Sequence, residues 1–127
     1  MMDPLKIILT GEPRTKKNSQ RIFVRPDGTR FVRPSAQFER YENSCLWQLK
    51  KYRRLEITGP VNVACMYYMP TMRKVDLCNL LEATCDILVR AGVLLDDNSA
   101  IVASHDGSRV VLDRSKPRVE ITITEVT

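Results

Sequence analysis

The stretch that decides the fold runs from residue 61 to residue 98, VNVACMYYMPTMRKVDLCNLLEATCDILVRAGVLLDDN. Its first part, 61–70, is rich in β-branched and aromatic residues and ends in a proline, which is typical of a strand. Residues 77–91 then place apolar side chains every three or four positions, which predicts an amphipathic helix. Gly92 stands where a helix commonly ends. The apolar stripe of this helix is expected to consist of Leu77, Leu81, Cys85 and Leu88.

Segments with strand and helix patterns lie on both sides of this unit. The expected strands are 5–11, 99–104, 109–113 and 118–126, with a hairpin over 22–34. Ser35 is a favourable N-cap for a second helix, 36–54, whose basic ending KKYRR suits a helix C-terminus. Asp106-Gly107 is expected to turn the first strand after the acidic region into the next. The sequence therefore predicts a single α+β domain, 1–127, with a mixed β-sheet flanked by two main helices.

Composition limits the class of protein. Of the 127 residues, 43% are hydrophobic and 28% are charged, which is ordinary for a globular chain. No apolar run approaches a membrane span and the first residues lack a signal-peptide pattern, so a cytoplasmic protein without a membrane partner is expected. Four cysteines without a CxxC pair and a single histidine argue against a structural zinc site. Each cysteine falls in an apolar pattern and is expected to be a reduced thiol in or near the core.

Charge is segregated along the chain, whose net charge is +5. Residues 10–35 hold seven basic residues against two acids, whereas residues 76–99 hold five acids against Arg90. A basic surface attracts nucleic-acid phosphates, and clustered carboxylates hold a divalent metal. This combination is what a metal-dependent nuclease requires.

The candidate site residues surround the helix 77–91, and they are Asp76, Asn79, Glu82, Asp86, Asp96 and Asp97. Those within the helix lie within about 60° of one another, which makes one polar ridge. Their oxygen atoms suit Mg²⁺, which usually keeps few protein ligands besides water and substrate phosphate. Three other interpretations remain open: an N-cap role for Asp76, an ion-pair ladder of Glu82, Asp86 and Arg90, and an ordinary turn at 96–98.

At these residues the sequence resembles a known family. The stretch YMPTMRKVDLCNLLEATCDILVRAGVLLDDNSAIV (68–102) is similar to the RusA family of Holliday junction resolvases. That family's signature is a strand ending in proline, basic residues, D-x-D-N-L, a helix with a further aspartate, and a later D-D pair. RVEITITEV (118–126) and GEPRTKKNSQR (11–21) resemble the family's last strand and early loop. The resemblance implies a homodimeric endonuclease, dependent on Mg²⁺ with Mn²⁺ as a possible substitute, that resolves four-way DNA junctions by paired symmetric nicks leaving 5′-phosphates.

The resemblance also implies roles for individual residues. Asp76 matches the family's first essential aspartate, and Asp97 matches the one after the helix, with Asp96 beside it. Two positions depart from the pattern, because the family's second aspartate is Cys78 here and its catalytic helix lysine is Glu82. Our hypothesis is that Glu82 takes over the metal-ligand work of the missing aspartate, since positions four residues apart share a helix face. A weakened or inactive enzyme that still binds DNA is the competing interpretation.

The remaining assignments concern support and DNA contacts. Asn79 either joins the metal shell or supports the helix start, whereas Asp86 is expected to play a structural or supporting role. The expected phosphate contacts are Arg14, Lys16, Lys17, Arg21, Arg25, Arg30, Arg33, Arg73 and Lys74. A homodimer suits a symmetric substrate that is cut twice. A non-catalytic DNA-binding protein and an endonuclease for other branched DNA are the alternatives.

One further motif, Ser104-His105-Asp106, spells a hydrolase triad in sequence. Neighbours on a strand point to opposite faces of the sheet, so these three are not expected to form a proton relay. His105 is instead expected to be a turn residue near the end of the sheet.

Overall fold

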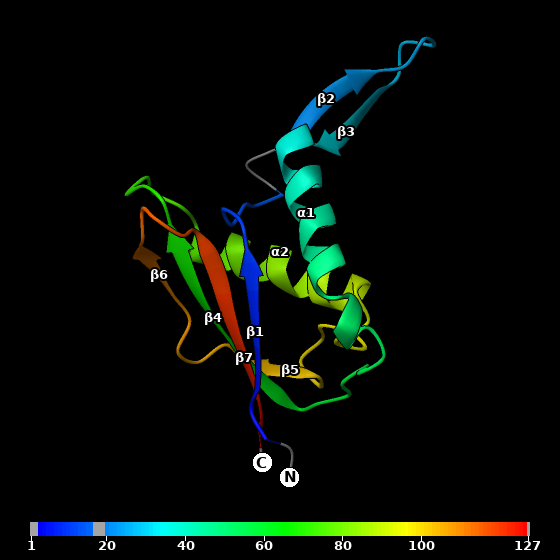
Figure 1. Ribbon diagram of the computed structural model, residues 1–127. Helices are drawn as coiled ribbons and strands as arrows, with labels where there is room; N and C mark the ends of the chain where they lie inside the picture. The colour runs from blue at the N-terminus through cyan, green and yellow to red at the C-terminus, as the bar shows by residue number, and fades with distance from the viewer. Residues whose placement is uncertain (1–2, 17–19, 127) are drawn as a thin grey trace.

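The computed structural model describes residues 3–16 and 20–126, with the backbone alone at 20–21 and 32–34. Its elements in chain order are β1 (Leu5–Thr10), β2 (Gln20–Val24), β3 (Arg30–Pro34), α1 (Ala36–Gln48), the 3₁₀ turn η2 (Lys50–Tyr52), β4 (Val61–Met69), α2 (Leu77–Arg90), β5 (Val102–Ser104), β6 (Arg109–Leu112) and β7 (Arg118–Glu125). Two helices and a mixed sheet make an α+β fold, so the predicted fold class is confirmed (Figure 1).

The main sheet has the order β1-β7-β4, and both β5 and β6 pair with the far side of β4. β7 is antiparallel to its two neighbours, whereas β5 and β6 run parallel to β4. The expected reversal at Asp106-Gly107 is therefore wrong. β5 lies beside the start of β4 at Val61–Asn62 and β6 lies beside its end at Met66–Met69, so the two follow one another along the same edge.

Asn62 explains why the chain continues instead of reversing between β5 and β6. Its Oδ1 accepts hydrogen bonds from the Ser104 hydroxyl at 2.5 Å and from the Asp106 amide at 2.7 Å. Its Nδ2 donates to the Asp106 carbonyl at 3.1 Å. The turn is thus held against β4 by a side chain distant in sequence, and the next strand resumes on the same edge.

The core lies on one face of the sheet. Alternate residues of β4, from Val61 to Met69, are buried, and Val119, Ile121 and Ile123 of β7 continue the same face. α1 and α2 pack against this face, since their buried side chains belong to the same apolar cluster. The opposite face keeps half-buried or exposed side chains, Ile8 of β1 among them.

α1 ends earlier than expected. Ser35 is its N-cap as predicted, with Oγ accepting from the Phe38 amide at 3.2 Å. The α-helix ends at Gln48, not at residue 54, and the Gln48 side chain bonds to the edge strand β1. Its Oε1 accepts from the Thr10 amide at 2.9 Å and its Nε2 donates to the Thr10 carbonyl at 3.1 Å. The basic run that follows belongs mainly to η2 and the loop after it.

α2 is rotated from the expected orientation. Its buried residues are Leu80, Ala83, Thr84, Cys85, Ile87 and Leu88. Leu77 and Leu81 are only partly buried, so half of the predicted stripe is displaced. The Tyr67 hydroxyl of β4 and Thr84 Oγ1 lie 2.6 Å apart in the core and fix the helix against the sheet. Gly92 ends the helix as predicted, at φ +80°.

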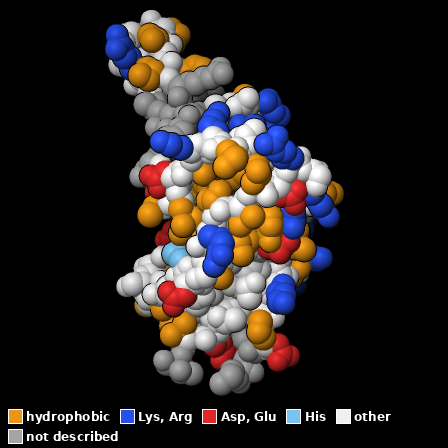
Figure 2. Space-filling view, turned by 90° about the vertical axis from the view of Figure 1, so that its left-hand side faces the viewer, with side chains coloured by type: hydrophobic (Ala, Val, Ile, Leu, Met, Phe, Trp, Pro, Cys, Tyr) orange, Lys and Arg blue, Asp and Glu red, His pale blue; other side chains and the backbone are white. Residues whose placement is uncertain are grey.

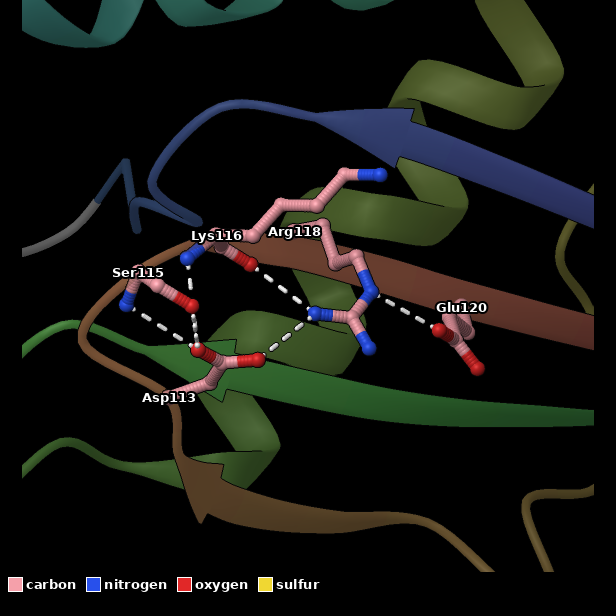
Figure 3. Close-up of polar contacts among 5 residues, drawn as sticks. All are labelled: Asp113, Ser115, Lys116, Arg118 and Glu120. Carbon is pink, nitrogen blue, oxygen red and sulfur yellow. Dashed lines mark hydrogen bonds and ion pairs between the residues drawn. The ribbon is translucent and has the colours of Figure 1, made fainter.

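Arg118, the first residue of β7, bonds to Asp113 and so links the end of β6 to the start of β7 (Figure 3). Its Nη1 donates to Asp113 Oδ2 at 2.9 Å, its Nε donates to Glu120 Oε2 at 2.7 Å, and its guanidinium carbon lies 3.8 Å from the Tyr68 ring centroid. The Asp113 Oδ1 atom accepts from the Ser115 amide and hydroxyl. These contacts hold the pKa of Asp113 down at about 2 and keep its carboxylate charged.

Candidate active site

Two of the predicted acidic residues meet in a pocket of about 260 Å³. Glu82 and Cys78 come from α2, Asp97 comes from the loop after α2, and His105 follows β5. Leu81 and Cys85 complete the lining. Cys78 and Glu82 open onto the same pocket, which confirms that they share one side of the helix.

The loop that carries Asp97 is anchored by the buried residues that precede it. Val93 and Leu94 are buried, and Leu94 forms a bridge with Ile57. Asp96 Oδ1 accepts from the Asp97 amide at 2.7 Å, and its Oδ2 accepts from Asn98 Nδ2 at 3.1 Å. Both oxygens of Asp96 thus shape the turn that presents Asp97, and Asp96 is not part of the pocket wall. This geometry supports the turn interpretation for Asp96 and leaves Asp97 as the residue that faces the pocket.

Asp76 is the N-cap of α2. Its Oδ1 accepts from the amides of Cys78 at 2.9 Å and Asn79 at 3.3 Å, which satisfies two free N–H groups of the first turn. The side chain is exposed, and it lies at the helix start rather than in the pocket wall. The N-cap interpretation is therefore confirmed. Asp76 Oδ2 takes part in neither of these bonds, so the role of Asp76 as a metal ligand stays a prediction.

Asp86 lies half-buried on α2, and its pKa depends on the charged residues around it. Burial raises its pKa first, and the negative charges of Asp97 and Glu82 raise it further. The positive charge of Lys16, in the basic N-terminal loop, lowers it. Arg90 does not take part in the ion-pair ladder considered for Glu82, Asp86 and Arg90, because it forms an ion pair with Glu42 of α1. The supporting role of Asp86 therefore stays a prediction.

The cysteines do not all behave as predicted. All four are free thiols, and Cys45, Cys65 and Cys85 are buried. Burial raises the pKa of the first two thiols to about 11 and that of Cys85 to about 12, so they remain protonated. Cys78 is exposed, which corrects the expectation of a thiol in or near the core. It falls in the first turn of α2, on the side that faces the pocket rather than the sheet.

His105 is the site residue that sequence reasoning missed. Its Nδ1 lies 2.8 Å from the Val63 carbonyl, which only accepts hydrogen bonds, so Nδ1 carries a proton. Its Nε2 lies 3.9 Å from Cys85 Sγ at the pocket. Ser104 bonds to Asn62 instead, so the triad is absent as predicted. No local signal could have found His105, because β5 and β6 share the edge of β4 only in the folded chain.

The basic residues are spread over several elements. Arg14 is half-buried and bonded to Glu12 at 3.0 Å and to Gln37 at 3.3 Å, which ties it into the fold. Arg73 and Lys74 are exposed just before α2. Lys17 lies outside the described residues, as do the side chains of Arg21 and Arg33.

The β2-β3 hairpin carries the remaining basic residues and projects beyond the start of α1 (Figure 1). Arg30 is exposed on it, and Arg25 lies 4.4 Å from the centroid of the Phe31 ring. On the face seen from the side of β6, lysine and arginine side chains are scattered among hydrophobic and acidic ones (Figure 2).

The pocket offers two carboxylates to a cation. Among the residues that the structure describes, no three His, Cys, Asp or Glu side chains stand close enough together to hold a metal ion as they are. Mg²⁺ is commonly held by one or two carboxylates together with substrate phosphates, so Glu82 and Asp97 fit this ion. No helix in the described ranges is long and apolar enough to cross a membrane.

Paired carboxylates beside a basic loop on an α+β scaffold are the features of a nuclease site. The family model described as endodeoxyribonuclease RusA matches residues 7–124. The chain is also similar to the crossover junction endodeoxyribonuclease RusA of Aquifex aeolicus (strain VF5), with 26% identity over 98 residues that cover 76% of this chain and 75% of that protein. The chain therefore belongs to the endodeoxyribonuclease RusA family. The predicted family and the predicted class of enzyme, a DNA endonuclease, are confirmed.

Proposed function

We propose that this chain resolves four-way DNA junctions in the cytoplasm, as a homodimer that makes paired symmetric nicks and requires Mg²⁺, with Mn²⁺ as a substitute. The observation that carries the proposal is the pocket in which Glu82 and Asp97 meet. Family membership supports DNA as the substrate. The relative from Aquifex aeolicus, named as a crossover junction endodeoxyribonuclease, supports the choice of branched DNA.

Glu82 and Asp97 are the residues that we assign to the metal. Both are exposed carboxylates that line the pocket, and Asp76 is placed to assist from the helix start. A bound Mg²⁺ supplies neutralisation of phosphate charge, activation of a water and stabilisation of the leaving 3′-oxygen. Lys16, whose positive charge lowers the pKa of Asp86, is assigned to hold the phosphate near these carboxylates.

The position of Glu82 supports the hypothesis that it replaces the missing aspartate. Cys78 and Glu82 are one helical turn apart and line the same pocket, so a carboxylate at either position enters the same space. A glutamate carries one methylene more than an aspartate, which shortens the gap left by the move. The site therefore keeps two carboxylates although Cys78 is not one of them.

The test is cleavage of a synthetic four-way junction in Mg²⁺ by purified variants. Glu82→Gln and Asp97→Asn should each reduce cleavage by more than about 100-fold, the upper end of the loss caused by mutating residues around a metal. Junction binding in EDTA should be retained, because neither residue is assigned to a phosphate. Glu56→Gln, an exposed acid that does not line the pocket, is the matched control and should cleave normally.

A rescue variant separates relocation of the ligand from damage to the site. If Glu82 does the work of an aspartate at position 78, then Cys78→Asp should restore cleavage in the Glu82→Gln background. Normal cleavage by Glu82→Gln alone would show that relocation is wrong. A wild-type chain that binds junctions without cutting them is the non-catalytic alternative. Faster cutting of flaps than of four-way junctions identifies the other branched-DNA alternative.

A further inference from the structure

A large hollow lies on the molecule away from the candidate site. It has a volume of about 700 Å³ and is formed by β1, the end of α1 and η2. We call it the Trp47 surface, and the residues that define it are Lys6, Ile8, Trp47, Lys50, Lys51 and Tyr52. β1 is the edge strand opposite β5 and β6, so this surface lies about 14 Å across the sheet from the strand edge that carries His105.

The aromatic part of this surface is exposed. Trp47 is the single tryptophan of the chain, and it is 70% exposed. Its neighbour Gln48 is fixed to the backbone of Thr10, which holds the end of α1 beside the edge strand. Ile8 beside it is 55% exposed. Large apolar side chains gathered at one exposed place commonly mark an interaction surface.

The charged part of the surface selects the kind of partner. Lys50 Nζ lies 4.0 Å from the centroid of the Trp47 ring, and Lys51 Nζ lies 5.2 Å from that of Tyr52. Lys6 adds a third ammonium, and no acidic residue belongs to the described lining. Lysines around an exposed aromatic ring are how proteins hold a nucleic-acid strand, with phosphates on the cations and a base stacked on the ring.

We propose that the Trp47 surface is a second DNA-binding surface, which takes a strand with an unstacked base. Lys6, Lys50 and Lys51 contact phosphates, and a base stacks on the indole face that Lys50 leaves uncovered. None of these residues is among the phosphate contacts assigned to the junction site. The inference rests on the proposed function only in that the ligand is DNA, and it does not require that the chain cut a junction.

A second copy of this chain fits the same surface poorly. In a two-fold interface the surface meets itself, so six ammonium groups would come together without an acid from the described lining. Interface cores are depleted in lysine for this reason. Lys6 also lies on an edge strand, where a lysine discourages pairing with another sheet.

The experiment uses Trp47 as its own reporter. A synthetic four-way junction, a linear duplex and a short oligothymidylate are each titrated into the full chain in EDTA, and tryptophan emission is recorded. Stacking should quench the emission, with the junction and the oligothymidylate more effective than the duplex because they offer unpaired or loosely paired bases. Anisotropy of the labelled DNA measures affinity in parallel.

Two variants and a matched control test the contacts. Trp47→Leu should weaken binding of the oligothymidylate about five-fold or more, the lower range for loss of one stacked base. Lys50→Ala with Lys51→Ala should lower the slope of log affinity against log salt by about 2, one unit per lost phosphate contact. Arg114→Ala with Lys116→Ala removes the same charge at exposed positions outside the surface and should leave the quenching unchanged.

Each outcome decides the inference. Unchanged emission when anisotropy reports saturated DNA would overturn it, as would an equal loss of slope in the control pair. A dimer that dissociates in Trp47→Leu, seen by sedimentation, would assign the surface to self-association instead. Quenching by DNA in a chain that cuts no junction would support this surface while the proposed function fails. Junction cutting without quenching would support the proposed function and overturn the inference about this surface.

Discussion

The buried pair of Tyr67 and Thr84 allows a prediction of stability from hydrogen-bond geometry. Thr84 Oγ1 donates to the Leu80 carbonyl at 2.9 Å, so its oxygen accepts the proton of the Tyr67 hydroxyl 2.6 Å away. Tyr67 is 0% exposed and Thr84 is 4% exposed. Burial raises the pKa of Tyr67, which therefore stays a neutral donor. The two side chains connect β4 to α2, the helix that carries Glu82.

Removing the donor and removing the acceptor should have unequal effects. Tyr67→Phe deletes one hydrogen bond but leaves Thr84 bonded to Leu80, so the free energy of unfolding should fall by about 1 kcal/mol. Thr84→Val leaves the buried Tyr67 hydroxyl with only the Cys65 thiol, a weak acceptor, as a partner, which should cost about 2 kcal/mol. The double variant has no stranded hydroxyl, so its loss should be about 1 kcal/mol and well below the sum of the single losses.

Urea unfolding followed by far-ultraviolet circular dichroism measures these differences, because the exposed Trp47 is a poor reporter of the core. Each kcal/mol should also lower the Tm by about 3–5 °C in a domain of this size. Thr84→Ser is the control, since it keeps the acceptor and loses only a methyl group. Equal losses in the two single variants, or additive losses in the double variant, would refute the assignment of donor and acceptor.

Three further predictions follow from single positions. Gly92→Ala should lower the free energy of unfolding by about 3 kcal/mol or more, measured by urea unfolding, because a Cβ would lie 2.1 Å from the Arg53 carbonyl at a positive φ; a milder loss would show that the helix end can shift. At pH 8 one thiol per folded chain, that of the exposed Cys78, should react rapidly with Ellman's reagent, and all four should react in urea; a Cys78→Ser chain that still reacts rapidly would contradict this. The pKa of Asp113 is lowered from 3.8 to about 2, chiefly by Arg118, so its stabilising effect is complete above about pH 4 and is lost as the pH falls towards 2. Asp113→Asn should therefore be less stable than wild type at pH 6 and nearly equal to it at pH 2, by urea unfolding, and an equal deficit at both values would exclude a linked proton.

The local patterns that predicted β4 and α2 were sufficient because each depends on nearby residues. The strand β4 itself and the glycine after α2 follow directly from the sequence. The rotation of α2 could not be predicted from the sequence, because packing in the core buries Leu80 and Ile87 while Leu81 lines the pocket. Periodicity shows that a helix has an apolar face, but the neighbouring elements decide which of several leucines lies at its centre.

Two features at the edge of the sheet were not predicted: the chain does not reverse at Asp106-Gly107, and His105 lines the pocket. Both have the same cause. A turn signal between two short apolar segments normally predicts a hairpin, and Asp106-Gly107 has that form. Here the side chain of Asn62 holds the turn against β4, and β4 is long enough to pair with both segments in succession. His105 reaches the pocket through the same arrangement. A contact between residues more than forty positions apart (Asn62 and Asp106 are 44 apart) has no local signature.

The acidic residues of α2 and of the loop after it lie close enough together to influence one another's charge. Asp97 and Glu82 both raise the pKa of Asp86, so the folded chain holds these carboxylates together against their repulsion. Lys16 lowers the pKa of Asp86, and it comes from the N-terminal loop rather than from the helix. If a divalent cation binds to Glu82 and Asp97, as proposed above, it would offset the negative charge that raises the pKa of Asp86.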